Sequence, residues 1–159
     1  MKKLIVSALL SVSTLLASSI EINDAYVRAT PPGLPNSAAF MQIENTTSKD
    51  ISITKVSSPI AKFVELHAHD MKNGVMKMYQ VKRITVPNHG KVSLQPGGFH
   101  IMLIGLHKPL KEGETVTFTL GLSNGDTKTI TAPIKSVMNG MNHKNMDHGH
   151  MHHNMDHSK

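Results

Sequence analysis

The sequence contains no cysteine and no tryptophan, and only two tyrosines and four phenylalanines occur among its 159 residues. Without cysteine the chain forms no disulfide, zinc ribbon, iron–sulfur cluster or thiolate nucleophile. A blue-copper electron-transfer site is excluded as well, because the short equatorial ligand of that site is a thiolate. The fold must therefore rest on its hydrophobic core alone.

A dense stripe of basic residues is also missing. Lysine and arginine exceed aspartate and glutamate by 17 to 11, which gives a formal net charge of +6, but the excess is dispersed along the chain. Nucleic-acid binding uses clustered basic residues together with aromatic side chains, so this class of function has little support. No Ser-His-Asp arrangement and no catalytic carboxylate pair is evident, so we expect a protein that is not an enzyme.

The first 19 residues have the pattern of a secretory signal peptide. Two lysines form the basic start, a short apolar run follows over residues 4–16, and Ala-Ser-Ser ends the segment. An apolar run of about 13 residues is too short to span a bilayer. We therefore predict export to the periplasm, cleavage near Ser19 and Ile20, and no stable membrane insertion of the mature chain.

Two regions of different composition follow. Residues 20–137 hold 28 Ile, Leu and Val side chains and four Phe, enough to form a hydrophobic core. Residues 138–159 hold six histidines, five methionines and no branched aliphatic side chain. Such a segment buries too little apolar surface to offset the entropy of ordering it. The sequence therefore predicts one folded domain over 20–137 and a disordered tail over 138–159.

Alternating apolar and polar residues, many of them β-branched, dominate the folded region. Turn signals such as Asn124-Gly125 separate the alternating runs, and no segment has the 3.6-residue apolar period of a helix. Many short strands in about 118 residues predict an all-β fold, either a Greek-key β-sandwich or a small barrel. The expected strands cover residues 20–29, 38–44, 51–57, 62–68, 75–86, 91–94, 99–105, 115–122 and 127–133.

Three of these strands carry His or Met residues two positions apart, so that both members of a pair lie on one face. If the three strands meet at one rim of the sandwich, the pairs converge. The sets that share a face are Glu65, His67 and His69, opposite Val64, Leu66 and Ala68; His100 and Met102, opposite Phe99, Ile101 and Leu103 on the expected core side; and Met76 with Met78.

Imidazole nitrogen and thioether sulfur together form a selective set of metal ligands. Sulfur favours soft Cu(I), imidazole serves several metals, and Mg²⁺ or Ca²⁺ prefers carboxylate and carbonyl oxygens. A site of two histidines and two methionines therefore suggests Cu(I). The alternative is structural, because a lone methionine on a strand usually fills the core and a lone exposed histidine is usually solvated. We accept the structural interpretation for Met41, His89 and His107. Both interpretations stay open, on this ground alone, for His67, Met78, His100 and Met102.

The spacing of these last four residues resembles a known signature. They follow the pattern H-x10-M-x21-H-x-M of the periplasmic copper chaperones called PCuAC. The surrounding sequence is similar as well, in residues 64–67, 74–78 and 94–103 and in two earlier segments, 24–28 and 35–41. The similarity spans about residues 22–133, which is essentially the whole folded region.

The resemblance implies a cupredoxin-like β-sandwich with one Cu(I) near its surface, bound by His67, Met78, His100 and Met102. It also implies delivery of copper to the CuA centre of cytochrome c oxidase, directly or through Sco-type thiol proteins. Three neighbouring residues are candidates for supporting roles around the ion, namely His69, Met71 and Met76.

The histidines and methionines of the tail interleave and repeat Met-Asp-His at 146–148 and 155–157. Expression tags are usually uninterrupted histidine, so the repeat favours a natural metal-binding tail. Imidazoles suit Cu(II) and thioethers suit Cu(I), so we expect the tail to capture either state and to supply the folded site. The candidate tail ligands are Met138, Met141, His143, Met146, His148, His150, Met151, His152, His153, Met155 and His157.

Other functions compete with that of a copper chaperone. In a copper sequestration or resistance protein the tail would dominate and delivery would play no part. A copper oxidase or superoxide dismutase is disfavoured, because a dismutase site needs many histidines and the folded region has five. The methionines argue against a nickel or zinc tail.

Overall fold

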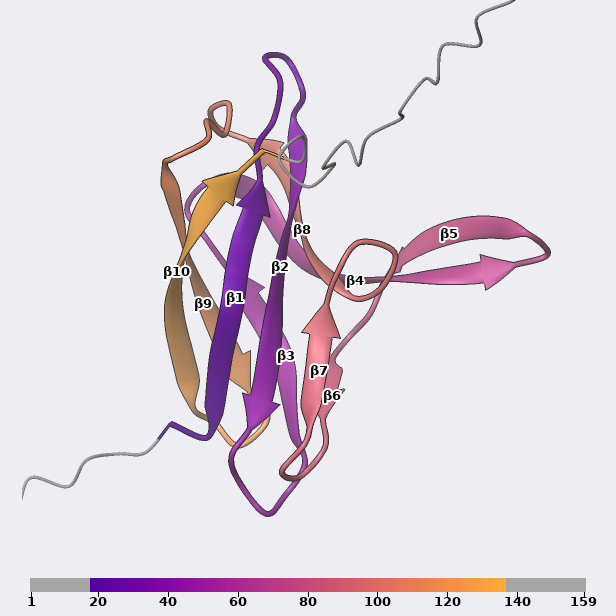
Figure 1. Cartoon of the computed structure of the whole chain (residues 1–159), viewed down its shortest axis with the longest axis vertical. Helices are drawn as coiled ribbons and strands as arrows, with labels where there is room; N and C mark the ends of the chain where they lie inside the picture. Colours follow the sequence, from indigo (N-terminus) through magenta and orange to yellow (C-terminus); the bar gives the residue numbers. More distant parts are fainter. Residues whose placement is uncertain (1–17, 137–159) are drawn as a thin grey trace, which may run out of the picture.

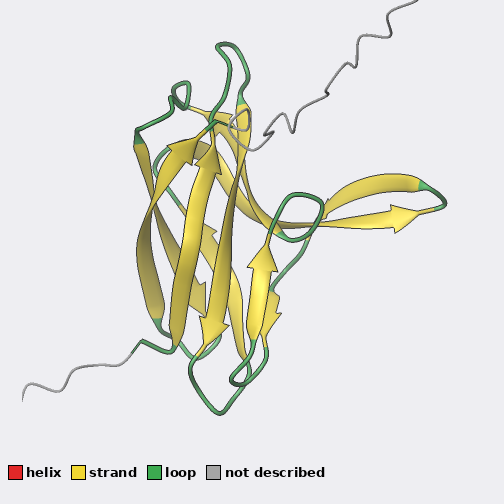
Figure 2. Ribbon diagram, in the orientation of Figure 1, coloured by secondary structure: helices red, strands yellow, loops and turns green. Residues whose placement is uncertain are grey.

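In the computed structural model, residues 18–136 are described, and they form ten β-strands (Figure 1). Within this range the chain contains strands and loops and no helix (Figure 2), hence none long and apolar enough to cross a membrane. The predicted signal peptide, except for its last two residues, and the predicted tail over 138–159 lie outside the described residues. The strands are β1 (Ile20–Arg28), β2 (Asn36–Asn45), β3 (Ile51–Ser57), β4 (Ala61–Lys72), β5 (Val75–Gln80), β6 (Ile84–Val86), β7 (Lys91–Leu94), β8 (His100–Leu106), β9 (Thr115–Leu122) and β10 (Thr127–Lys135).

The strands form one mixed sheet that curls into two layers. Its order is β5-β4-β8-β2-β1-β10-β9-β3-β6, and β7 pairs with β2 off this path. The β1–β10 pair is parallel, whereas the other strand pairs within 20–135 are antiparallel. Figure 1 shows β3 and β9 behind β1 and β2. This arrangement confirms the all-β sandwich expected from the sequence.

Apolar residues from both layers fill the space between them. Phe118 and Leu120 of β9 and Ile101 and Leu103 of β8 are fully buried. The alternation of β8 is therefore as predicted, but Phe99 is not on the core side, because it is 38% exposed. Phe99 comes directly after the turn over 95–98, and β8 begins only at the next residue, so the alternation does not extend back to it.

The strand expected over 75–86 is two strands with different partners. All six residues of β5 are exposed, and β5 pairs with β4. Ile84 and Val86 of β6 are buried and pair with β3 in the other layer. The chain crosses between the layers at 81–83. A continuous run of strand-forming residues did not reveal this change of partner.

β4 and β5 extend beyond the sandwich as a hairpin (Figure 1). β4 continues to Lys72, past the end predicted for it. Asn73 and Gly74 connect the two strands with φ angles of 53° and 73°. Positive φ at both positions is what a two-residue type I′ hairpin turn requires. The turn therefore fixes the register in which β5 lies against β4.

Candidate metal centre

Three neighbouring strands bring the candidate ligands together at the base of the hairpin. β4 lies between β5 and β8 in the sheet. Its register places His69 opposite Met78 of β5 and His67 opposite His100 of β8. Residues directly opposite each other project from the same face of a sheet, and so do residues two apart on one strand. The side chains of His67, His69, Met78 and His100 therefore lie on one face of the sheet.

His100 is buried, with 2% of its surface exposed, although it faces away from the hydrophobic core cluster. Its Nδ1 lies 3.0 Å from the carbonyl oxygen of Gly98, and a carbonyl only accepts, so Nδ1 carries the proton and donates. Burial lowers the pKa of His100, and the charges of His69, His67 and Arg28 act in the same direction, against the opposing effect of the Gly98 hydrogen bond. The ring is thus held neutral, with its lone pair on Nε2.

That lone pair faces a sulfur atom. Nε2 of His100 lies 3.1 Å from Sδ of Met78. With the proton on Nδ1, both facing atoms are electron-pair donors, an arrangement that a cation between them would stabilise. Metal bonds of about 2.0 Å to nitrogen and 2.3 Å to sulfur, at a tetrahedral angle, place the two donor atoms about 3.5 Å apart. A shift of about 0.4 Å would therefore let His100 and Met78 bind one ion.

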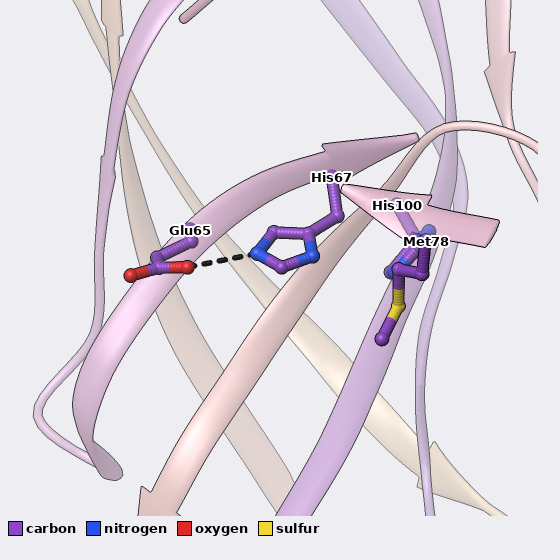
Figure 3. Close-up of polar contacts among 4 residues, drawn as sticks. All are labelled: Glu65, His67, Met78 and His100. Atoms are coloured by element: carbon purple, nitrogen blue, oxygen red, sulfur yellow. Dashed lines mark hydrogen bonds and ion pairs between the residues drawn. The ribbon is translucent and has the colours of Figure 1, made fainter. Parts of the chain in front are cut away.

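His67 is oriented by a carboxylate. Its Nε2 lies 2.8 Å from Oε2 of Glu65, which accepts the hydrogen bond (Figure 3). In the neutral ring the lone pair is then on Nδ1, which is buried and has no hydrogen-bond partner among residues 18–136. Figure 3 shows this nitrogen on the side of His100 and Met78. The ring centroids of His67 and His100 are 5.7 Å apart. A carboxylate on the outer nitrogen is a frequent partner of metal-binding histidines.

An open cavity of about 410 Å³ borders these donors. Met78, His100 and Met102 line it, so the second thioether of the predicted set reaches the same space. Phe40 also lines the cavity and packs at a tilt against His100, with ring centroids 6.4 Å apart. Met78 is 46% exposed. An ion bound here would be accessible to a partner protein.

The other candidates of the folded region lie in different surroundings. His69 lines the cavity, and its ring stacks on that of His100 at 4.9 Å. Met71 and Met76 pair with each other at the exposed end of the hairpin and do not line the cavity. The residues interpreted as structural are a buried core methionine and two exposed histidines, Met41, His89 and His107. The tail candidates lie outside the described residues.

Sequence reasoning did not identify two groups that orient the imidazoles, the Glu65 carboxylate and the Gly98 carbonyl. Alternation placed Glu65 on the face of His67, but the hydrogen bond depends on side-chain conformation. Residues 18–136 also contain no group of three His, Cys, Asp or Glu side chains placed to hold an ion. A four-ligand site in this cavity would therefore combine thioethers with imidazoles.

The buried His100 makes the stability of the metal-free protein depend on pH. The pKa of this group is lower in the folded chain than the value of about 6.5 in the unfolded chain. As the pH falls below about 6.5, the unfolded chain therefore binds more protons at His100 than the folded chain does. The contribution of His100 to the free energy of unfolding is then lost as the pH falls through the lower pKa of the folded chain. We expect the melting temperature, followed by circular dichroism with a chelator present, to fall more between pH 7 and pH 5 than it does in His100→Asn. Equal falls would contradict this role.

Comparisons with known proteins place this chain in a family. The family model described as LpqE-like lipoprotein matches residues 20–134. A protein of Leifsonia xyli subsp. xyli that is named as a lipoprotein, Lxx21020, is 34% identical over 120 residues, which cover 75% of this chain and 71% of the relative.

Two solved structures are similar to the described domain. The copper-bound PCuAC domain from PmoF2 matches with a TM-score of 0.64 at 22% identity, over 75% of this chain and 94% of that domain. The Cu(I) form of DR1885 from Deinococcus radiodurans matches with a TM-score of 0.56 at 36% identity, over 72% of this chain and 76% of DR1885. The match to PmoF2, at 22% identity, shows the fold alone. The match to DR1885 shows a similar fold together with 36% sequence identity. The fold implied by the sequence resemblance is confirmed.

Proposed function

The chain belongs to the LpqE-like family and has the fold of PCuAC domains, and from this premise we propose that it is a copper carrier that binds Cu(I) and passes it to partner proteins. The ion is cargo, and it is released intact. Its proposed ligands are Met78, His100 and Met102, which line the cavity, together with His67, whose ring lies 5.7 Å from that of His100 between centroids. The copper-bound forms of PmoF2 and DR1885 support copper as the metal.

The contact between Nε2 of His100 and Sδ of Met78 is the observation that carries this proposal. A buried neutral imidazole that places its lone pair against a thioether suits a soft cation, because sulfur ligands select Cu(I) over hard cations such as Mg²⁺. The orphaned Nδ1 of His67 supplies a further donor on the same face. Burying a polar nitrogen without a partner costs about 1–3 kcal/mol, which a metal bond would recover.

Ligand exchange is the proposed route of release. Thioethers are neutral and weaker ligands than thiolates, and the half-exposed Met78 is open to attack from solvent. An incoming thiolate replaces one thioether at a time, so copper moves between proteins without becoming a free ion. We propose Sco-type thiol proteins or the CuA subunit of cytochrome c oxidase as acceptors, since both kinds of site bind copper through cysteine.

The tail and the location complete the proposal. We propose that residues 138–159 capture Cu(II) or Cu(I) and raise the local concentration of copper, to the order of millimolar, near the folded site. The lipoprotein names of the relatives support an exported protein of the cell envelope. We therefore propose export after cleavage near Ser19 and Ile20.

Transfer kinetics test the proposed function. Cu(I)-loaded protein is mixed with increasing amounts of a synthetic peptide that contains two cysteines, and copper on each species is measured after rapid gel filtration. We expect the transfer rate to rise in proportion to peptide concentration, because the thiolates attack the bound ion. A chain that ends at residue 137 serves as the control for copper held by the tail. It should bind fewer copper ions and load more slowly, and transfer from its folded domain should be unchanged.

Two outcomes would contradict the proposal. A rate independent of peptide concentration would mean that copper leaves as a free ion, and the carrier mechanism would be wrong. Copper held mainly by residues 138–159 and not surrendered to the peptide would favour the second candidate function, sequestration of excess copper. The composition of the tail, six histidines and five methionines in 22 residues, is the observation that favours this alternative.

A further inference from the structure

His69 lies in the cavity although the family signature does not include it. Its ring stacks on the ring of His100 with centroids 4.9 Å apart and an interplanar angle of 27°. This separation is shorter than the 5.7 Å between the rings of His67 and His100. The register of β4 and β5 also places His69 directly opposite Met78. His69 is therefore adjacent to both atoms of the nitrogen–sulfur contact that carries the proposed function.

A nitrogen of His69 is available for a new bond. Nδ1 of this ring is buried and has no hydrogen-bond partner within residues 18–136. Buried imidazole nitrogens are normally paired, and an unpaired one costs free energy. The buried, unpaired Nδ1 of His67 is in the same condition. The site thus contains two buried imidazole nitrogens without a hydrogen-bond partner within residues 18–136, on side chains two positions apart on β4.

The two histidines differ in their access to the cavity. His69 lines it together with Met78, His100 and Met102, whereas His67 does not line it and its outer nitrogen bonds Glu65. An ion that enters from solvent therefore meets a complete set of two nitrogens and two sulfurs that contains His69. To reach His67 the ion must lie outside this cavity, on the side of Glu65.

We propose that His69 is a fifth copper-binding side chain that takes the place of His67 beside the other three ligands. This inference rests on the proposed function, because it assumes that copper occupies the cavity. Two overlapping ligand sets share His100, Met78 and Met102 and differ in their second imidazole. Copper in the cavity is held through His69, and exchange between the two histidines keeps the ion four-coordinate as it moves between the cavity and the side of His67.

Substitutions of both histidines, singly and together, test this inference. The parent is the full chain with the eleven tail histidines and methionines changed to serine, here called the tail-silent protein. Four variants are made in it: His67→Gln, His69→Gln, the double variant, and His107→Gln, an exposed histidine outside the site, as the matched control. One equivalent of Cu(I) is added, X-ray absorption counts nitrogen and sulfur ligands, and competition with a chromophoric chelator gives the affinity.

We expect each single variant to keep two nitrogen and two sulfur ligands, because the remaining histidine replaces the missing one. The double variant should keep one nitrogen and two sulfurs. Its affinity should fall by about tenfold beyond the product of the two single effects, since the second substitution removes the substitute ligand. The control should match the tail-silent protein in both measurements.

The outcomes separate this inference from the function on which it rests. If His67→Gln alone leaves one nitrogen ligand and the double variant is no weaker, His69 does not bind copper and the inference is wrong, while the carrier function stands. If the tail-silent protein shows no sulfur ligands at all, the proposed copper site itself is wrong. If His69→Gln loses a nitrogen and His67→Gln does not, then His69 is the sole second imidazole and exchange is overturned.

Discussion

Replacing Met78 and Met102 together by leucine is expected to lower the Cu(I) affinity of the folded domain by at least about a hundredfold. Loss of a residue that only supports a metal ligand typically costs 10–100-fold in affinity, and here two proposed direct ligands are removed. Leucine preserves volume and apolarity, so packing changes little. The measurement is competition with a chromophoric Cu(I) chelator in the tail-silent protein.

The hairpin offers a matched control for this substitution. Met71 and Met76 are 63% and 54% exposed, and they pair with each other on β4 and β5, away from the cavity. Changing both to leucine removes two thioether sulfurs, as the first double variant does, and should leave the affinity nearly unchanged. Equal losses in the two double variants would show that thioethers of the hairpin in general, and not those of the cavity, hold the ion.

Phe118→Ala is expected to destabilise the folded domain by about 3–5 kcal/mol. Phe118 is completely buried in β9 and belongs to the core between the two layers. Its truncation leaves a cavity that the surrounding strands fill only in part. A domain of this size has a total stability of about 5–15 kcal/mol, so the melting temperature should fall by about 10–20 °C.

Phe63→Ala is the control for this prediction. Phe63 is 51% exposed on β4, where the ammonium group of Lys62 lies 5.2 Å from its ring centroid. Its removal should cost about 1 kcal/mol or less, as surface substitutions usually do. Thermal unfolding of both variants by circular dichroism checks the difference. Similar losses in the two would mean that the space between the layers is not the main source of stability.

The shared facing of the candidate ligands on β8 and on β4 could be predicted because it depends on local geometry. Successive residues of a strand face opposite sides, so His100 and Met102 lie opposite Ile101 and Leu103 wherever the strand lies in the fold. The same rule gave His67 and His69 a common face. It was wrong for Phe99, which comes before the first residue of β8 and is exposed. Alternation therefore holds only as far as the strand itself.

The partners of these residues could not be predicted in the same way. The hydrogen bond from His67 to Glu65 and that from His100 to Gly98 decide which nitrogen carries each lone pair. Both depend on side-chain conformation and on the turn at 95–98. The stacking of His69 on His100 needs the register between β4 and β8, and the two histidines are 31 positions apart in the chain. A shift of register by one residue would move every one of these side chains to the other face.

The residue types alone restricted the chemistry, since paired imidazoles and thioethers in a chain without thiolates favour a soft metal over a hard cation. Strand periodicity, which follows from the backbone geometry of each residue, settled which of these groups face together. Folding of distant strands decided how close they come, and it brought His100 within 3.1 Å of a sulfur that lies 22 residues earlier. Contacts of that kind arise from packing among many residues at once, so no local pattern encodes them.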